Sequence, residues 1–148
     1  MALTGKLEYE KEIKADPKKF FHCFMDHPNH LHKAVVHESH RATILEGDGK
    51  NIGSSVHFNY ALDGKTVSST AVKIEAVDEE KYSVTLRCYE GDVMKHYKVF
   101  KVHCQVFTGS AKCCIEYEKL NESVPEPTEY IDFARKMLEG IFKESDHN

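Results

Sequence analysis

The chain has 148 residues and a formal net charge of −4, with 41% hydrophobic and 30% charged residues. These values are typical of one soluble globular domain, which we place over residues 1–148. They exclude a disordered chain, because the apolar content is high enough to build a core. They also argue against nucleic-acid binding, which needs a basic surface. No apolar run approaches the about 18 residues of a membrane span, so no membrane insertion is expected.

The N-terminal segment MALTGKLEYEKEIK lacks the apolar run and the cleavage site of a secretory signal. It contains the first predicted strand, over about residues 5–14. The five cysteines, an odd number without C-x-x-C spacing, are interpreted as reduced thiols. A cytoplasmic protein is therefore expected.

Two short helices are predicted after this strand. Asp16-Pro17 is typical of a helix start, in which Asp16 caps the helix and Pro17 takes its first position. His27-Pro28-Asn29 ends that helix. A second helix is expected over about residues 29–35, followed by a strand over about residues 37–46.

Five further runs predict an antiparallel meander, because each alternates apolar and polar residues over part of its length. Asp63-Gly64 is a strong hairpin turn, and Gly91-Asp92 and Thr108-Gly109 are weaker turn signals. The total is seven strands, which are long enough that the sheet must twist and curl around another element. The five runs cover about residues 52–62, 65–77, 81–90, 93–107 and 110–119.

The C-terminal segment carries one apolar stripe at helical spacing, from Tyr130 to Phe142. It predicts a helix over about residues 127–144, with Thr128 as its N-cap. A single amphipathic helix covers a long curved sheet only in part. The space between helix and sheet is therefore a candidate cavity.

Several short motifs follow one another in a characteristic order. They are Gly5-Lys6-Leu7-Glu8, Glu46-Gly47-Asp48-Gly49, Leu62-Asp63-Gly64-Lys65, Glu90-Gly91-Asp92-Val93-Met94-Lys95, and Glu116-Tyr117-Glu118-Lys119-Leu120-Asn121-Glu122 with Val124-Pro125 and Pro127. Each motif alone is weak, but the ordered set is specific. Over about residues 5–145 the chain resembles the major latex proteins and ripening-related proteins of plants, a branch of the birch-pollen-allergen-like, class-ten pathogenesis-related superfamily.

The resemblance implies an α+β helix-grip (START-like) fold. In this fold a seven-stranded curved antiparallel sheet wraps around a long C-terminal helix, two short helices close one end, and a hydrophobic cavity lies inside. It also implies binding of hormones, steroids, flavonoids or alkaloids, in defence or stress response. Members often carry Trp where this chain has Phe58 and Cys113, so a roomier or differently shaped pocket is expected.

Candidate ligand-binding residues are the inward-facing side chains of the predicted strands and helix. In the alternation of its predicted strand, His40 lies on the same side as Ala42 and Ile44. It could act there as an acid or base near neutral pH, although a buried, hydrogen-bonded histidine without a catalytic role is the simpler interpretation. His96 is a second candidate, unless a bulge reverses its side. The predicted set is Tyr9, His40, Phe58, Tyr60, Tyr82, Phe100, Tyr117, Phe133, Met137 and Ile141.

Two other chemistries are disfavoured by spacing. The glycine-rich loop Glu46–Gly53 lacks the P-loop pattern, so it predicts a strand connection at the cavity mouth rather than a phosphate site. Six of the ten histidines lie between residues 22 and 40, but their irregular spacing does not favour a metal site. No metal, cofactor or nucleophilic catalytic set is predicted.

The leading hypothesis is a protein that carries or sequesters a small hydrophobic plant metabolite. One alternative is a cavity enzyme, a cyclase or isomerase that uses His or Tyr as acid–base groups. Another is a ligand-gated protein-interaction module. Catalysis is not the first expectation, and a monomer is expected, with a weak dimer as the alternative.

Overall fold

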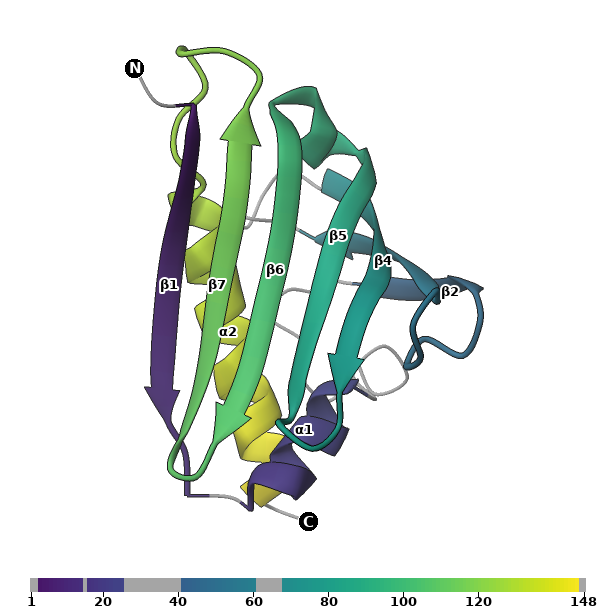
Figure 1. The fold of residues 1–148 in the computed structure, drawn as a ribbon, viewed down its shortest axis with the longest axis vertical. Helices are drawn as coiled ribbons and strands as arrows, with labels where there is room; N and C mark the ends of the chain where they lie inside the picture. Colours follow the sequence, from purple (N-terminus) through teal and green to yellow (C-terminus); the bar gives the residue numbers. More distant parts are fainter. Residues whose placement is uncertain (1–2, 15, 26–40, 61–67, 147–148) are drawn as a thin grey trace.

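The computed structural model describes residues 3–14, 16–25, 41–60 and 68–146, without the side chains of residues 41 and 140–146. The predicted helix over 29–35, the Asp63-Gly64 turn and the first part of the predicted 37–46 strand lie outside the described residues. The described elements form the predicted α+β helix-grip architecture (Figure 1).

The sheet is antiparallel and seven-stranded, in the order β1-β7-β6-β5-β4-β3-β2. Its members are β1 (Thr4–Glu12), β2 (Arg41–Glu46), β3 (Ser55–Tyr60), β4 (Ser68–Asp78), β5 (Ser83–Gly91), β6 (Tyr97–Phe107) and β7 (Ser110–Lys119). The helices are α1 (Pro17–Met25), the 3₁₀ helix η3 (Asp92–Lys95) and α2 (Thr128–Asp146).

The start of α1 confirms the capping prediction. The Asp16 carbonyl accepts from the Phe20 N–H at 2.9 Å, and the Asp16 carboxylate accepts from the Lys19 N–H at 3.2 Å. Pro17 occupies the first helical position, where its missing N–H costs nothing. The helix buries Phe20 and Phe21 against the core.

The prediction for the start of α2 was wrong by one position. The Pro127 carbonyl accepts from the Tyr130 and Ile131 N–H groups, both at 3.2 Å, so Pro127 occupies the cap position and Thr128 is the first helical residue. Burial of Pro127 explains the difference, because tertiary packing holds this residue at the helix entrance.

The predicted strand over 93–107 was also wrong at its beginning. Residues Asp92–Lys95 form η3, and β6 begins only at Tyr97. Gly91 enters this turn with φ of 109°, and the Asp92 carboxylate accepts from the Ser69 N–H at 2.8 Å. Val93 is fully buried as part of the turn. His96 lies just after it and is exposed, so the inward orientation considered for His96 is not observed.

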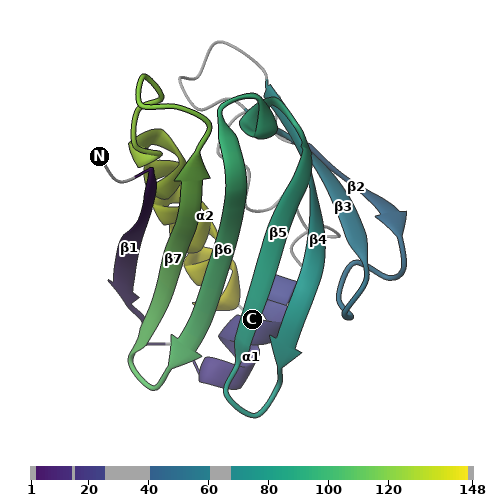
Figure 2. The same cartoon turned by 45° about the horizontal axis from the view of Figure 1, so that its top comes forward.

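Bulges bend the sheet around α2. The register shifts between Ala71 and Val72 and again between Ile74 and Ala76 on β4, and such bulges increase local bend and twist. In both views α2 lies behind β1 and β7, while β2 and β3 turn away from the other strands (Figure 2). The helix therefore covers only part of the concave face.

The buried side chains of the described residues form two clusters rather than one. The first lies where α1, α2 and the β6–β7 hairpin meet, and includes Phe20, Val106 and Leu138. The second lies toward η3, and includes Val93 and Phe100. The candidate site occupies the space between them.

Candidate functional site

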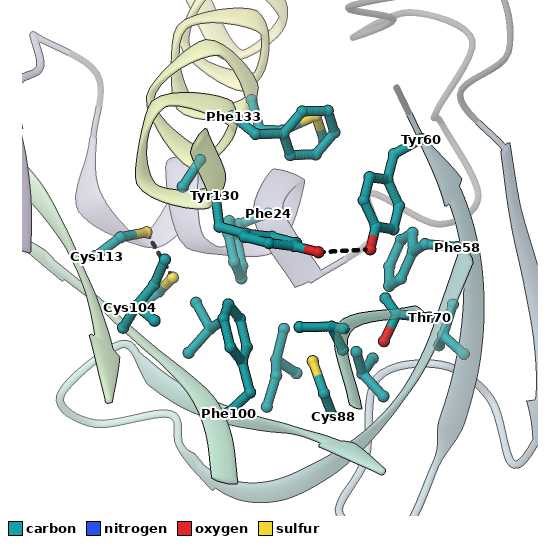
Figure 3. Close-up of a pocket in the computed structure, with 18 of the residues that line it drawn as sticks. Phe24, Phe58, Tyr60, Thr70, Cys88, Phe100, Cys104, Cys113, Tyr130 and Phe133 are labelled. Atoms are coloured by element: carbon teal, nitrogen blue, oxygen red, sulfur yellow. Dashed lines mark hydrogen bonds between the residues drawn. The ribbon is translucent and has the colours of Figure 1, made fainter. Parts of the chain in front are cut away.

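A cavity of about 200 Å³ lies between α2 and the curved sheet. Its wall takes residues from both core clusters, and it also includes Leu86 and Val102, which pack against both clusters. Figure 3 shows the labelled wall residues pointing into this space from α1, α2 and the sheet. Most are aliphatic or aromatic, and among the described wall residues none carries a charge at neutral pH.

Half of the predicted binding residues line this cavity. Their faces follow from the alternation on β3 and β6 and from the apolar stripe of α2. They are Phe58, Tyr60, Phe100, Phe133 and Met137. Two others lie outside the described part of the chain: His40, and the side chain of Ile141.

Three predicted wall residues do not line the cavity. Tyr82 precedes β5 and has φ of 54°, so strand parity does not apply to it, and its ring packs 5.8 Å from that of Phe21. Tyr9 is half-buried on the edge strand β1 and packs against the first core cluster. Tyr117 is buried opposite Gly5, with its ring centroid 5.9 Å from that of Tyr97. These rings face the helix side, but they belong to filled parts of the core.

Tyr130 is the main wall residue that the prediction missed. It stands on the first turn of α2, and its ring centroid lies 5.0 Å from that of Phe100 and 6.1 Å from that of Tyr60. Its position at the start of the apolar stripe of α2 could have identified it as a wall residue from the sequence. Phe24 and Met25 of α1 were missed because the relative placement of α1 is not encoded in its own periodicity.

The principal polar groups of the wall are two hydroxyls that face each other. Tyr60 Oη and Tyr130 Oη lie 3.4 Å apart, from β3 and α2 respectively (Figure 3). Burial, and then the hydrogen bond to Tyr130, raise the pKa of Tyr60, and burial also raises the pKa of Tyr130. Both groups are therefore protonated hydroxyls at neutral pH, suited to donate or accept a hydrogen bond but not to act as a base.

Smaller polar groups complete the wall. Thr70 Oγ1 donates to the Glu90 carbonyl at 3.1 Å, which satisfies its proton within the sheet. Burial raises the pKa of the neighbouring Cys88 thiol to about 11. Cys104 and Cys113 lie side by side in the wall formed by β6 and β7. These groups offer one hydroxyl and three thiol groups to an occupant.

The loop between β2 and β3 lies at the cavity, as predicted for a strand connection. Gly49 is part of the cavity wall and has φ of 79°. Asp48 holds the loop, because its carboxylate accepts from the Lys50 and Asn51 N–H groups at 2.8 and 2.9 Å. These backbone bonds are the main reason that the pKa of Asp48 falls to about 2. Two of the loop N–H groups, those of Lys50 and Asn51, are thus already bonded to a carboxylate.

A Thr–His–Glu row lies on the opposite face of the sheet. His103 Nδ1 is 3.0 Å from Thr85 Oγ1, and His103 Nε2 is 3.2 Å from Glu116 Oε2. The residue types resemble a hydrolytic triad, but none of the three lines the cavity. We interpret the row as a cross-strand link between β5, β6 and β7.

Two further features of the described residues bear on other functions. Within those ranges, no group of three or more His, Cys, Asp or Glu side chains is arranged to hold a metal ion. None of the helices described is long and apolar enough to cross a membrane.

Comparisons with a family model, with curated proteins and with solved structures agree on one family. The family model described as "Pathogenesis-related protein Bet v 1 family" matches residues 2–146. MLP-like protein 43 of Arabidopsis thaliana is 44% identical over 147 residues, which is 95% of this chain and 92% of that protein. The crystal structure of ginseng major latex-like protein 151 from Panax ginseng matches with a TM-score of 0.88 and 33% identity, over 97% of this chain and 99% of that one.

A more distant structure has the same fold. Norcoclaurine synthase from Thalictrum flavum matches with a TM-score of 0.81, over 98% of this chain and 88% of that one. Its sequence identity is 18%, so the similarity extends to the fold alone.

Proposed function

Because this chain belongs to the Bet v 1 family of pathogenesis-related proteins, and within it resembles the major latex-like proteins, we propose that it carries or sequesters a small, neutral, hydrophobic plant metabolite in the cavity between α2 and the sheet. The observation that carries this proposal is the composition of the wall, whose described residues are apolar apart from hydroxyls and thiols.

The wall favours a neutral occupant over a charged one. Moving an ionised group from water into an apolar site without a partner of opposite charge is strongly unfavourable. Burial of apolar area contributes about 25 cal/mol per Å², less the cost of ordering the ligand. An apolar cavity of about 150 Å³ binds benzene in another protein, so a cavity of about 200 Å³ suits a compact aromatic or alicyclic skeleton.

The two tyrosine hydroxyls would orient the ligand. At 3.4 Å the hydrogen bond between Tyr60 and Tyr130 is long, so a ligand hydroxyl or carbonyl could replace it without leaving a polar group unsatisfied. A ligand with one oxygen on an otherwise apolar skeleton fits this arrangement. Hormone, steroid, flavonoid and alkaloid classes all remain candidates where the bound form is neutral.

The enzyme hypothesis is less well supported by the wall. Acid–base catalysis needs a group that changes protonation near neutral pH, and the described wall residues include no histidine, lysine or carboxylate. Tyr60 and Tyr130 remain protonated, for the reason given above. His40, the predicted acid–base group, lies outside the described residues, so carriage is the function we propose first.

The test uses N-phenyl-1-naphthylamine, a neutral apolar probe whose fluorescence rises in apolar surroundings. Phe58→Trp enlarges a ring that lines the cavity, and we expect it to weaken probe binding about tenfold, equivalent to about 1.4 kcal/mol. Fluorescence titration of the purified full chain measures the dissociation constant. The anionic analogue 8-anilinonaphthalene-1-sulfonate should bind less tightly than the neutral probe, because its sulfonate has no cationic partner among the described wall residues.

Phe107→Trp is the matched control. Phe107 lies at the end of β6, is 42% exposed and does not line the cavity, so this variant should bind the probe as the unmodified chain does. Equal weakening in both variants would mean that the effect of Phe58→Trp does not come from its place in the cavity wall. Equal or tighter binding of the anionic analogue would contradict the proposal of a neutral ligand.

A further inference from the structure

Two cysteines of the β6–β7 hairpin are directly opposed across the strands. Cys104 on β6 pairs with Cys113 on β7, and the hairpin between them turns at Thr108-Gly109. The sulfur atoms lie 2.6 Å apart (Figure 3). Both residues are buried, with 7% and 2% of their surface exposed, and both line the cavity.

The backbone register places this pair at the position most suited to a cross-strand bond. The Val106 N–H donates to the Tyr82 carbonyl on the β5 side, at 2.9 Å, so the polar backbone groups of Val106 point away from β7. Cys104 is two residues away and has the same orientation, which makes Cys104–Cys113 a non-hydrogen-bonded pair. The Cα atoms of such pairs are about 4.5 Å apart, within the range of about 4.4–6.8 Å that a disulfide spans.

We infer that Cys104 and Cys113 form a redox site in the cavity wall, at which a small neutral peroxide converts the two thiols into a disulfide. With hydrogen peroxide, one thiol sulfur attacks the peroxide, the O–O bond breaks, and a sulfenic acid and one water form. The second thiol then attacks the sulfenic sulfur, which forms the S–S bond and releases a second water. Two thiols and one peroxide thus give one disulfide and two waters.

The surroundings explain why the oxidant should be neutral and the reaction slow. The other members of the surrounding core cluster are apolar, and the cavity wall beside the pair carries no charge among its described residues. The hydrogen bond between the two thiols, and then burial, raise the pKa of the Cys104 thiol well above its ordinary value. The Cys104 thiolate is therefore scarce at neutral pH, and its oxidation should accelerate as the pH rises.

Two neighbouring features make the pair easy to isolate experimentally. Cys114 directly follows Cys113, so by strand alternation its side chain lies on the other face of the sheet. It pairs with Glu8 of β1 and is only half-buried. Trypsin cleavage after Lys101, Lys112 and Lys119 separates Cys104 from Cys113. A disulfide between them therefore joins two peptides that would otherwise be released singly.

The experiment treats the fully reduced chain, freed of reductant, with hydrogen peroxide at about pH 8, and then labels the remaining thiols with N-ethylmaleimide under denaturing conditions. Intact mass counts the labels on the five cysteines. We expect the unmodified chain and the Cys114→Ser variant to lose two labels each. Cys104→Ser and Cys113→Ser should keep a label on every remaining cysteine.

Peptide mapping of the Cys114→Ser variant keeps the test decisive if the other two variants fail to fold. In this variant, a linked pair of peptides 102–112 and 113–119 can arise only from Cys104 and Cys113. Under peroxide conditions that do oxidise dithiothreitol, full labelling of the chain would overturn the inference. A disulfide that maps to other cysteines would overturn it as well.

Discussion

Gly91 shows how one residue sets the geometry at the end of a strand. It pairs with Thr70 across β4 and β5, precedes η3, and has φ of 109°, a conformation that residues with a Cβ rarely adopt. A Cβ at this position would meet the Ser69 carbonyl oxygen and lie 2.7 Å from Thr70 Cα. The glycine thus allows β4 to approach the turn that buries Val93 in the cavity wall.

Gly91→Ala should therefore destabilise the fold by about 2 kcal/mol or more, from the combined backbone strain and steric clash. The free energy of unfolding in urea measures the effect. Gly109→Ala is the control, because Gly109 has φ of 92° but an added methyl group would meet no atom within 4 Å, so only strain of about 1 kcal/mol applies. Equal losses in the two variants would mean that the close approach to Ser69 has no energetic effect.

At the scale of elements, the β2–β3 loop depends on one carboxylate. Asp48 accepts hydrogen bonds from two backbone N–H groups and from Ser54 Oγ, at 3.1 Å for the hydroxyl. These bonds favour the ionised form and lower its pKa from 3.8 to about 2. Because the pKa is lower in the folded chain, the contribution to stability is complete above about pH 4 and is lost as the pH falls toward 2.

Asp48→Asn should make the free energy of unfolding less dependent on pH between 4 and 2, with the stability of the variant falling below that of the unmodified chain above pH 4. Urea denaturation at a series of pH values checks this. Glu79→Gln, in the exposed turn between β4 and β5, removes the same charge from another loop and serves as the control. An Asp48→Asn profile parallel to that of the unmodified chain would contradict the role assigned to this carboxylate.

For the whole molecule, the cavity is a consequence of curvature. The bulges on β4 bend the sheet, while α2 packs mainly toward β1 and β7, so a space that both core clusters border stays open beside the helix. Tyr130 spans part of the intervening space from α2, and its hydroxyl faces that of Tyr60 on β3. An occupant would fill the remaining gap and contact both clusters, which couples binding to the stability of the entire fold.

This coupling predicts a thermal shift. N-phenyl-1-naphthylamine at 100 times its dissociation constant should stabilise the folded chain by about 2.7 kcal/mol, which corresponds to a rise of about 5–10 °C in the unfolding midpoint. Thermal unfolding followed by circular dichroism measures it. At the same probe concentration Phe58→Trp should show a smaller rise and Phe107→Trp the full one. An unchanged midpoint for the unmodified chain, at saturation, would show that the probe does not bind selectively to the folded state.

The sequence by itself determined most of the described elements and the faces they present, apart from the η3 turn and the cap of α2. Alternation with period two identified the inward sides of β3 and β6, helical spacing identified the apolar stripe of α2, and Asp16-Pro17 marked the start of α1. These features are readable because they depend on local geometry, which repeats within a few residues. The motif order also led to the correct family.

Only the tertiary structure decided which inward residues border empty space. Tyr9 and Tyr117 have the correct parity but lie where other elements fill the core, and Tyr82 sits in a left-handed turn that ends the alternation. Parity specifies a side of the sheet, whereas a cavity depends on where bulges bend the strands and how far the helix stands from them. The contact between Cys104 and Cys113 has the same origin, because it arises from strand register and not from the spacing of either residue alone.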